Sequence, residues 1–467
     1  MNWRNPILRS SLFAFRPTVY RTLKLLREHD SSSPGSLRQL HDATLASLLL
    51  HAWKNTEYYR EILSDVGVIK DGTVYLENFE NIPILTKEII RNEGRRLRAR
   101  ELPKGRKAYL NRTGGSTGEP IEYWQDNVYW DVNVATRLYH FEMLGKELGE
   151  PELKIWGADR DIFLETGTIS ARAQNFLYNR RIRTCSHLTD SDIEQIVEEV
   201  NRFRPKMIWG YTDGMYSIAQ YVLRKHLGFH PPAAVLVGGG TLLPKMSEEM
   251  QAAFNAPTIN FYGSREMGHI ASSCKELDGM HTSSYSHKVE VLSQAGRPIV
   301  GEDGSLILTS LHNYAMPFIR YSIGDRGRMS DGLCACGSGY PILESVSGRE
   351  MESFLTKDGA LISPIYLITS IGTLVNTDLI RKIQFIQESF SKVVVKIVIS
   401  PQVAAEDLNE HLNLIRERLT RIMGEDCAVD FERVAEIPPT KSGKYLYTVS
   451  KLEKRDALSS LPDSEVA

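Results

Sequence analysis

The sequence lacks long hydrophobic runs, abundant cysteine and an excess of charge of one sign. One apolar run, Val393 to Ile399, is interrupted by a lysine and is far shorter than the roughly 18 residues of a membrane-spanning helix. Five cysteines among 467 residues indicate free thiols in a reducing, cytoplasmic compartment rather than a secreted disulfide framework. The 56 basic and 58 acidic residues leave a net charge of -2, which excludes global attraction to nucleic acid. We therefore expect a soluble globular protein that recognises its partners at local sites.

The N-terminal segment is basic and contains no acidic residue before Glu28. Its basic residues are Arg4, Arg9, Arg16, Arg21, Lys24 and Arg27, interleaved with leucine and phenylalanine. We interpret residues 1–35 as a basic helical leader. Two readings are open: a solvated helix that covers the main body, which we favour, or an organelle transit peptide or membrane-surface helix that makes peripheral membrane contact.

From about residue 105 onward, short apolar runs alternate with helical patterns, as in an α/β sheet with crossover helices. The clearest helix is predicted over Asp190 to Phe203, with Thr189 as N-cap and Asp192 three residues later. Beyond residue 350 the pattern becomes that of a compact unit with strands near 383–387, 392–400 and 428–433 and a helix over 406–423. The sequence thus predicts an α/β protein: a large multi-layer α/β domain over 1–348 and a small mobile α+β domain over 349–467.

A glycine-rich segment, Asn111 to Pro120, reads N-R-T-G-G-S-T-G-E-P. Glycines allow backbone N–H groups to approach a phosphate chain, and hydroxyls add further donors, so these residue types suit a polyphosphate cradle. The segment is not a Walker A loop because no Lys-Ser/Thr pair follows the last glycine. A glycine-rich hairpin turn is the structural alternative.

Four further motifs follow in order. They are F-Y-G-S-R-E-M-G (261–268), M-P-F-I-R-Y-S-I-G-D-R (316–326), S-G-R-E (347–350) and P-P-T-K-S-G-K-Y (438–445). Together with the glycine-rich segment they resemble the core motifs of the adenylate-forming enzymes. Three segments have residue sequences most similar to the phenylacetate-CoA ligase branch, including its CapK-like and coenzyme F390 synthetase-like members. They are the glycine-rich loop, N-Y-A-M-P-F-I-R-Y and C-A-C-G. The resemblance covers nearly all of residues 40–450.

The resemblance implies that the loop binds the β- and γ-phosphates of ATP through Thr113, Gly114, Gly115, Ser116, Thr117 and Gly118. It also implies that Tyr262, followed by Gly263, stacks on adenine. The turn formed by Gly238, Gly239 and Gly240 would pass close beside that ring, where a side chain would not fit.

Four more roles are implied in the same way. Glu266 would bind Mg²⁺, a hard cation that prefers carboxylate and phosphate oxygens. Asp325 would accept hydrogen bonds from both ribose hydroxyls, and Arg349 would lie at the hinge between the domains, near the ribose. Lys444 would reach the substrate carboxylate and the α-phosphate from the small domain. Each has a plainer alternative: Tyr262 could be a core residue, Asp325 a turn cap and Lys444 a solvated lysine.

A possible metal site lies outside these motifs. Cys274 and His281 form a C-x6-H pattern, and Cys334 and Cys336 form C-x-C some 50 residues later. Three thiolates and an imidazole form a tetrahedral Zn²⁺ ligand set, and four protein ligands favour a structural over a catalytic ion. His269 and His287 are alternatives to His281. Buried thiols with a chance C-x-C are the plainer reading.

We interpret the chain as an ATP-dependent ligase that forms an acyl-adenylate, releases pyrophosphate and then transfers the acyl group to coenzyme A. The first alternative is transfer to an amine on a sugar or amino acid in surface polysaccharide biosynthesis, as the resemblance to CapK-like members suggests. A nucleotide-binding scaffold without turnover is the second. ATP, Mg²⁺, Zn²⁺ and coenzyme A are the expected cofactors, and a small carboxylic acid is the expected substrate. The sequence identifies neither that acid nor the oligomeric state.

Overall fold

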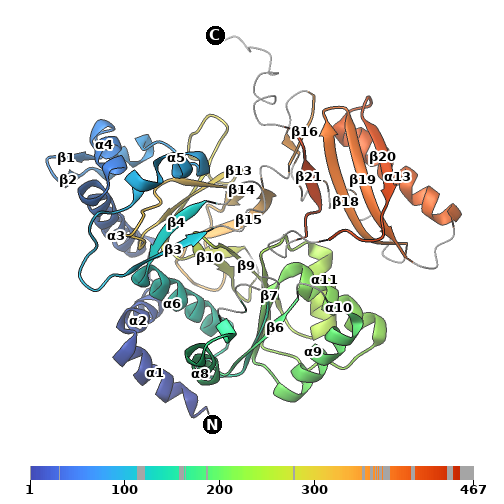
Figure 1. Cartoon of the computed structure of the whole chain (residues 1–467), viewed down its shortest axis with the longest axis horizontal. Helices are drawn as coiled ribbons and strands as arrows, with labels where there is room; N and C mark the ends of the chain where they lie inside the picture. Colours follow the sequence, from blue (N-terminus) through green and yellow to red (C-terminus); the bar gives the residue numbers. More distant parts are fainter. Residues whose placement is uncertain are drawn as a thin grey trace. The chain divides into compact units, whose positions relative to one another are not determined.

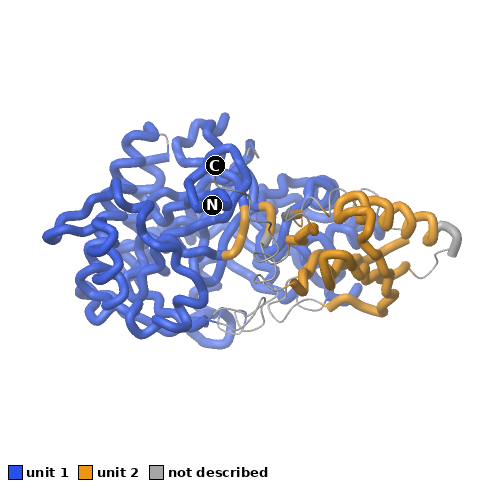
Figure 2. Tube along the Cα trace, turned by 90° about the horizontal axis from the view of Figure 1, so that it is seen from above, with its two compact units in different colours: residues 1–323, 327–346, 441–443 blue, residues 324–326, 347–440, 444–467 orange. Residues whose placement is uncertain are grey.

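The computed structural model describes most of the chain (Figure 1). The described residues are 2–30, 32–112, 121–156, 162, 165–185, 188–276, 279–349, 353–357, 361–362, 364, 367, 371, 379–400, 405–438 and 445–452. The chain divides into two compact units, shown in blue and orange in Figure 2. The first contains residues 1–323, 327–346 and 441–443, and the second contains 324–326, 347–440 and 444–467. No helix within the described ranges is long and apolar enough to cross a membrane.

The largest sheet in the described part of the chain has eleven strands, in the order β12-β13-β14-β15-β11-β10-β9-β8-β7-β5-β6. Its parallel part consists of β5 (Glu152–Trp156), β6 (Arg180–Thr184), β7 (Met207–Tyr211), β8 (Ala234–Gly238) and β9 (Thr258–Ser264). The other strands are β10 (Gly268–Ser273), β11 (Met280–Thr282), β12 (His287–Leu292), β13 (Gly304–Ser310), β14 (Tyr321–Met329) and β15 (Ile342–Arg349). The predicted α/β fold class is confirmed.

The two faces of the parallel part differ in chemistry. Because side chains alternate along a strand, Leu153 and Ile155 of β5 lie on one face and Lys154 and Trp156 on the other. The first face packs against helices α9 (Asp190–Phe203), α10 (Thr212–Lys225) and α11 (Pro244–Phe254) in an apolar cluster. The second face packs against α6 (Asn127–Met143). The charged and aromatic side chains of β5 therefore lie on the face near α6.

Helix α9 has the predicted boundaries. The Thr189 side chain accepts a hydrogen bond from the backbone N–H of Asp192, and the Asp192 side chain accepts one from the backbone N–H of Thr189. This reciprocal capping box satisfies two N–H groups that the first helical turn leaves unpaired. At the other end, Arg204 adopts a left-handed conformation with φ 50°, which stops the helix before Pro205.

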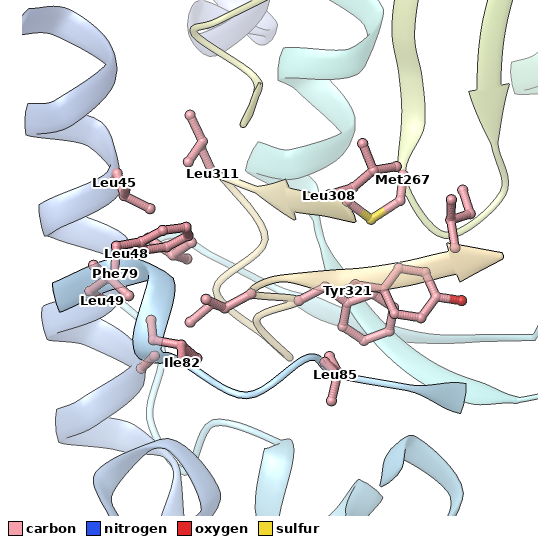
Figure 3. Packing of buried hydrophobic residues seen from close by; sticks show 14 of the residues in the cluster. Leu45, Leu48, Leu49, Phe79, Ile82, Leu85, Met267, Leu308, Leu311 and Tyr321 are labelled. Atoms are coloured by element: carbon pink, nitrogen blue, oxygen red, sulfur yellow. The ribbon is translucent and has the colours of Figure 1, made fainter. Parts of the chain in front are cut away.

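A second apolar core of the first unit lies between the N-terminal elements and strands of the large sheet (Figure 3). It joins Leu45, Leu48 and Leu49 of α3 to Met267, Leu308 and other buried residues of the strands. The elements around it are α3 (Pro34–Asn55), α4 (Glu57–Asp65), β1 (Ile69–Lys70), β2 (Thr73–Val74), the 3-10 helix η1 (Leu76–Asn81), α5 (Lys87–Leu97) and the antiparallel pair β3 (Ala108–Arg112) and β4 (Glu122–Asp126). Through Met267, this core supports the turn between β9 and β10.

The basic N-terminal segment forms α1 (Arg4–Phe15) and α2 (Pro17–His29), and it covers the main body. Buried leucines of both helices pack with Ala135, Leu138 and Tyr139 of α6. Two of the basic residues bind acids on α6: Arg16 pairs with Asp131, and Arg27 pairs with Glu142. Trp3, Phe13 and Phe15 remain exposed, and a peripheral membrane contact through them stays a prediction.

The second unit contains a four-stranded sheet in the order β20-β19-β18-β21. Its elements are β16 (Phe354–Leu355), β17 (Leu361–Ile362), β18 (Ile380–Ser389), β19 (Lys392–Ile399), α13 (Ala405–Met423), β20 (Ala428–Arg433) and β21 (Thr448–Ser450). The predicted apolar stripe of the helix is buried against the sheet at Leu408, Leu412, Ile415 and Leu419, with Ile422 at its margin. Helix periodicity therefore identified the face that forms this core.

Candidate active site

The turn after β8 requires glycine because it packs tightly against both neighbouring strands. A Cβ on Gly238 would lie 2.6 Å from the carbonyl oxygen of Phe261, and one on Gly239 would lie 2.9 Å from the ring of Tyr211. Gly239 also has φ +75°, a conformation that other residues seldom adopt. The Thr212 hydroxyl donates to the carbonyl of Gly240 at 3.2 Å. The backbone of this turn is thereby held at the carboxyl ends of the strands, where open α/β sheets bind their ligands.

Tyr262 and Gly263 lie on β9, next to this turn. Gly263 pairs with His269 of β10, and a Cβ at Gly263 would lie 2.4 Å from the carbonyl oxygen of Gly268. Tyr262 is half-buried, and part of its side chain packs against the apolar core. The ring thus combines a packing role with partial exposure, so stacking on adenine stays a prediction.

Glu266 lies in the turn between β9 and β10, and its side chain is buried. Its carbonyl oxygen accepts hydrogen bonds from Gln125 Nε2 and from the Tyr129 hydroxyl, each at 3.0 Å. The Tyr321 hydroxyl donates to its Oε1 at 3.2 Å. No lysine or arginine within the described ranges pairs with this carboxylate. Burying a charge without a counter-charge is costly, and a divalent cation would remove that cost. Glu266 could therefore hold Mg²⁺.

The structure describes other predicted site residues only in part. Asp325 is a buried residue of β14, a strand of the same sheet as Tyr262. Arg349 is the last residue of β15, and its side chain is not described. Lys444 and the loop residues Thr113, Gly114, Gly115, Ser116, Thr117 and Gly118 lie outside the described residues. The strands that precede and follow this loop in the sequence, β3 and β4, pair antiparallel, with Arg112 opposite Glu122.

The four residues of the predicted metal site lie together. The ligand atoms of Cys274, His281, Cys334 and Cys336 are all within 4.8 Å of one another. The sulfurs of Cys274 and Cys334 are 3.5 Å apart, and Cys336 Sγ is 3.4 Å from His281 Nε2. Tetrahedral zinc with bonds of about 2.3 Å places its ligand atoms about 3.8 Å apart. Burial raises the pKa of the Cys274 thiol to about 12, so a cation would be needed to make its thiolate stable.

The alternative histidines are engaged elsewhere. His269 Nε2 lies 2.8 Å from His140 Nδ1, and His287 Nε2 lies 2.7 Å from the carbonyl oxygen of Met267. Burial lowers the pKa of His287 to about 4, so this ring is neutral at physiological pH. Of the three histidines named from the sequence, His281 is the one grouped with the cysteines.

A group of charged residues near α6 was not predicted from the sequence. Glu152 is fully buried between Lys146 and Arg180, and Lys154 pairs with Glu165 at 2.5 Å. Arg137 of α6 lies near Trp209, with its Cζ 5.1 Å from the ring centroid. The available signal was Glu152 and Lys154 inside a strand whose other side chains are apolar.

Comparison with known proteins agrees with this architecture. Residues 354–451 match the family described as CapK C-terminal domain. Protein CapK of Staphylococcus aureus is 24% identical over 440 residues, covering 93% of this chain and 92% of that protein. A phenylacetate-coenzyme A ligase of Thermus thermophilus is 22% identical over 430 residues, covering 86% of this chain and 93% of that protein.

A crystal structure of 2-hydroxyisobutyryl-CoA ligase in the postadenylation state, in complex with an acyl-AMP, is similar in fold. Its TM-score is 0.73 at 17% sequence identity, and the match covers 93% of both chains. The fold is therefore that of the adenylate-forming CoA ligases. Within this class, nearly the whole chain is similar in sequence to Protein CapK and to the phenylacetate-coenzyme A ligases, and residues 354–451 match the CapK C-terminal domain.

Proposed function

We propose that this protein activates a carboxylic acid with ATP and Mg²⁺ and then transfers the acyl group to coenzyme A. In the first step a carboxylate oxygen attacks the α-phosphorus, the bond to the bridging oxygen breaks, and pyrophosphate leaves with that electron pair. Such a reaction depends chiefly on positioning and on neutralising charge. The acyl-adenylate then reacts with the thiol of coenzyme A and releases AMP.

The observation that carries this proposal is the buried carboxylate of Glu266. It lies at the end of the motif that begins with Phe261, and its Oε1 is oriented by Tyr321. A fixed carboxylate without a cationic side chain within the described ranges suits an Mg²⁺ ion that also binds phosphate oxygens. Similarity to phenylacetate-coenzyme A ligases supports coenzyme A as the acceptor.

The second candidate is transfer of the acyl group to an amine of a sugar or amino acid in surface polysaccharide biosynthesis. The match of residues 354–451 to the CapK C-terminal domain, together with the near full-length similarity to Protein CapK, favours it. A scaffold without turnover would need neither Glu266 nor Lys444 to be functional.

Pyrophosphate release distinguishes these functions. The protein is incubated with ATP, Mg²⁺ and a panel of aryl, fatty, hydroxy, amino and dicarboxylic acids, with and without coenzyme A. Acid-dependent release with consumption of coenzyme A is the expected result. Release without that consumption favours amide formation, and no release with any acid favours the scaffold.

Asp325→Ala is expected to weaken ATP binding. If Asp325 accepts hydrogen bonds from the ribose hydroxyls, the loss of one charged hydrogen bond raises the dissociation constant about 10- to 150-fold. Equilibrium titration with ATP measures this change. Asp331→Ala, at an exposed aspartate beyond β14, is the matched control and should leave the constant unchanged. An unaltered constant in Asp325→Ala would remove the ribose role.

We also propose one structural zinc ion in the first unit, held by Cys274, His281, Cys334 and Cys336. Metal analysis of protein prepared in metal-free buffer should find about one zinc per chain. Cys336→Ser should reduce zinc content well below one equivalent and lower the Tm, because a structural metal contributes to folding free energy. Cys185→Ser, which changes a cysteine outside the cluster, should retain the zinc. Zinc-free wild-type protein with an unchanged Tm would contradict the proposal.

A further inference from the structure

A cluster of buried and half-buried charges and aromatic rings lies on the α6 face of the parallel sheet. Lys154 and Trp156 project from β5, and Trp209 projects from β7, where it pairs in register with Lys154. Lys154 Nζ lies 4.5 Å from the ring centroid of Trp156 and 4.7 Å from that of Trp209. Arg137 approaches Trp209 from α6. All of these residues belong to the first unit.

Among the residues that the structure describes, the cluster holds more positive than negative charge. Its acids are Glu152 and Glu165, and its cations are Arg137, Lys146, Lys154 and Arg180. Burial would raise the pKa of Glu152, but Arg180 and Lys146 outweigh it and lower that pKa to about 2, so this acid is ionised. Glu152 pairs with both Lys146 and Arg180, and Glu165 pairs with Lys154.

Within the described part of this cluster, Arg137 is the cation without an acidic partner. No hydrogen bond or ion pair to its guanidinium occurs among the described residues, and its Nε is buried without a partner. Burial, together with repulsion from Arg180, lowers its pKa, although a guanidinium remains charged in proteins. Arg137 as a whole is half-buried. Enclosing a cation without an anion is costly, so an anion bound beside Nε would offset that cost.

The cluster adjoins the turn of Gly238 to Gly240. The ring centroids of Trp156 and Tyr211 lie 4.3 Å apart, and Tyr211 is the residue against which Gly239 packs. On the other side, His269 stacks on Phe261 with ring centroids 5.6 Å apart, and Phe261 packs against Gly238. The carboxyl ends of β5, β7 and β8 thus connect the proposed adenylate site with Arg137.

We propose that Arg137, assisted by Lys154, binds a second carboxylate on the acid substrate, so that the enzyme selects a dicarboxylic acid. This inference rests on the proposed function, because it assumes that the other carboxylate is the one activated. A guanidinium can bind a carboxylate through two parallel hydrogen bonds. Trp156 and Trp209 exclude water beside it, which strengthens those bonds.

Equilibrium binding tests this inference without turnover. Tryptophan fluorescence is titrated, with and without AMP, using the straight-chain dicarboxylates from succinate to suberate and monocarboxylates of the same lengths. In the wild-type protein the best dicarboxylate should bind about 10- to 150-fold more tightly than its monocarboxylate partner, as expected for charged hydrogen bonds. Equal affinity for the two series would overturn the proposal without any variant.

Arg137→Gln should abolish the preference for dicarboxylates over monocarboxylates of the same length. Arg137→Lys should restore part of it, because the charge is kept and the planar geometry is lost. Arg183→Gln is the matched control, since Arg183 on the neighbouring strand pairs with Glu199 of α9. An equal loss of affinity for both series in Arg137→Gln would contradict the inference. So would a preference that Asp159→Asn or Asp161→Asn strengthens, since either acid, outside the described residues, would then neutralise Arg137.

Failure of the inference and failure of the proposed function give different results. If dicarboxylates bind selectively but no acid releases pyrophosphate from ATP, the subsite stands and adenylation is refuted. If monocarboxylates and dicarboxylates bind equally and both release pyrophosphate, adenylation stands and the dicarboxylate subsite is refuted.

Discussion

Replacing Glu266 by glutamine should slow acyl-adenylate formation about 10²- to 10³-fold, the effect of losing one preorganised electrostatic contact. Glutamine can still accept the hydrogen bond from Tyr321 through its amide oxygen, so the fold should be retained. It carries no negative charge, and the binding of Mg²⁺ should therefore weaken. Acid-dependent pyrophosphate release, measured at saturating ATP over a range of Mg²⁺ concentrations, should show a lower maximal rate and a higher Mg²⁺ requirement.

Tyr321→Phe is the matched control for Glu266→Gln. It removes the hydrogen bond to Oε1 at 3.2 Å but keeps both the ring and the carboxylate. The carboxylate itself remains in Tyr321→Phe, so the rate should fall by less than it does in Glu266→Gln. An unchanged rate and Mg²⁺ requirement in Glu266→Gln would show that this carboxylate does not carry the metal.

Lys444→Ala should separate the two half-reactions. The family resemblance assigns this lysine, which lies outside the described residues, to the substrate carboxylate and the α-phosphate. A cation about 4 Å from a unit charge interacts at roughly 4 kcal/mol at an effective dielectric near 20, before its own desolvation is subtracted. Its loss should slow adenylate formation about 10²- to 10³-fold. Transfer from a preformed acyl-adenylate presents no incoming carboxylate and should continue at nearly the wild-type rate.

Two assays on the same folded variant measure this difference. Pyrophosphate release reports the first half-reaction, and consumption of supplied acyl-adenylate with its acceptor reports the second. The matched control is Lys451→Ala, which removes a lysine paired with Glu388 in the second unit and should leave both rates unchanged. Equal slowing of both half-reactions in Lys444→Ala would contradict a role of Lys444 in adenylate formation alone.

Local signals explain which parts of the fold could be predicted. The capping pair of Thr189 and Asp192 defined the start of α9, and the stripe of leucine and isoleucine defined the buried face of α13. The antiparallel extension of the large sheet was not predicted. It depends on pairings such as Met280 with Leu343, whose partners are distant in the sequence and carry no shared local pattern.

The candidate sites divide in the same way. The cysteine spacing grouped the four metal ligands, but only the structure selected His281, because it shows His269 and His287 bonded elsewhere. Arg137 could not have been found from its neighbours in the sequence. What distinguishes it is the pairing of the surrounding acids with other cations, a property that depends on contacts between separate elements.

The packing of α1 and α2 on α6 has a practical consequence for work with this protein. Basic leaders are often removed when a chain is shortened for expression. Here a chain that begins at α3 would lose Leu8, Leu12, Val19, Leu23 and Leu26 from their shared core. It would also strip two arginine partners from the helix that carries Arg137. Affinity tags should therefore extend the N-terminus rather than replace it. Binding data from shortened versions would describe a protein in which α6 lacks its contacts with α1 and α2.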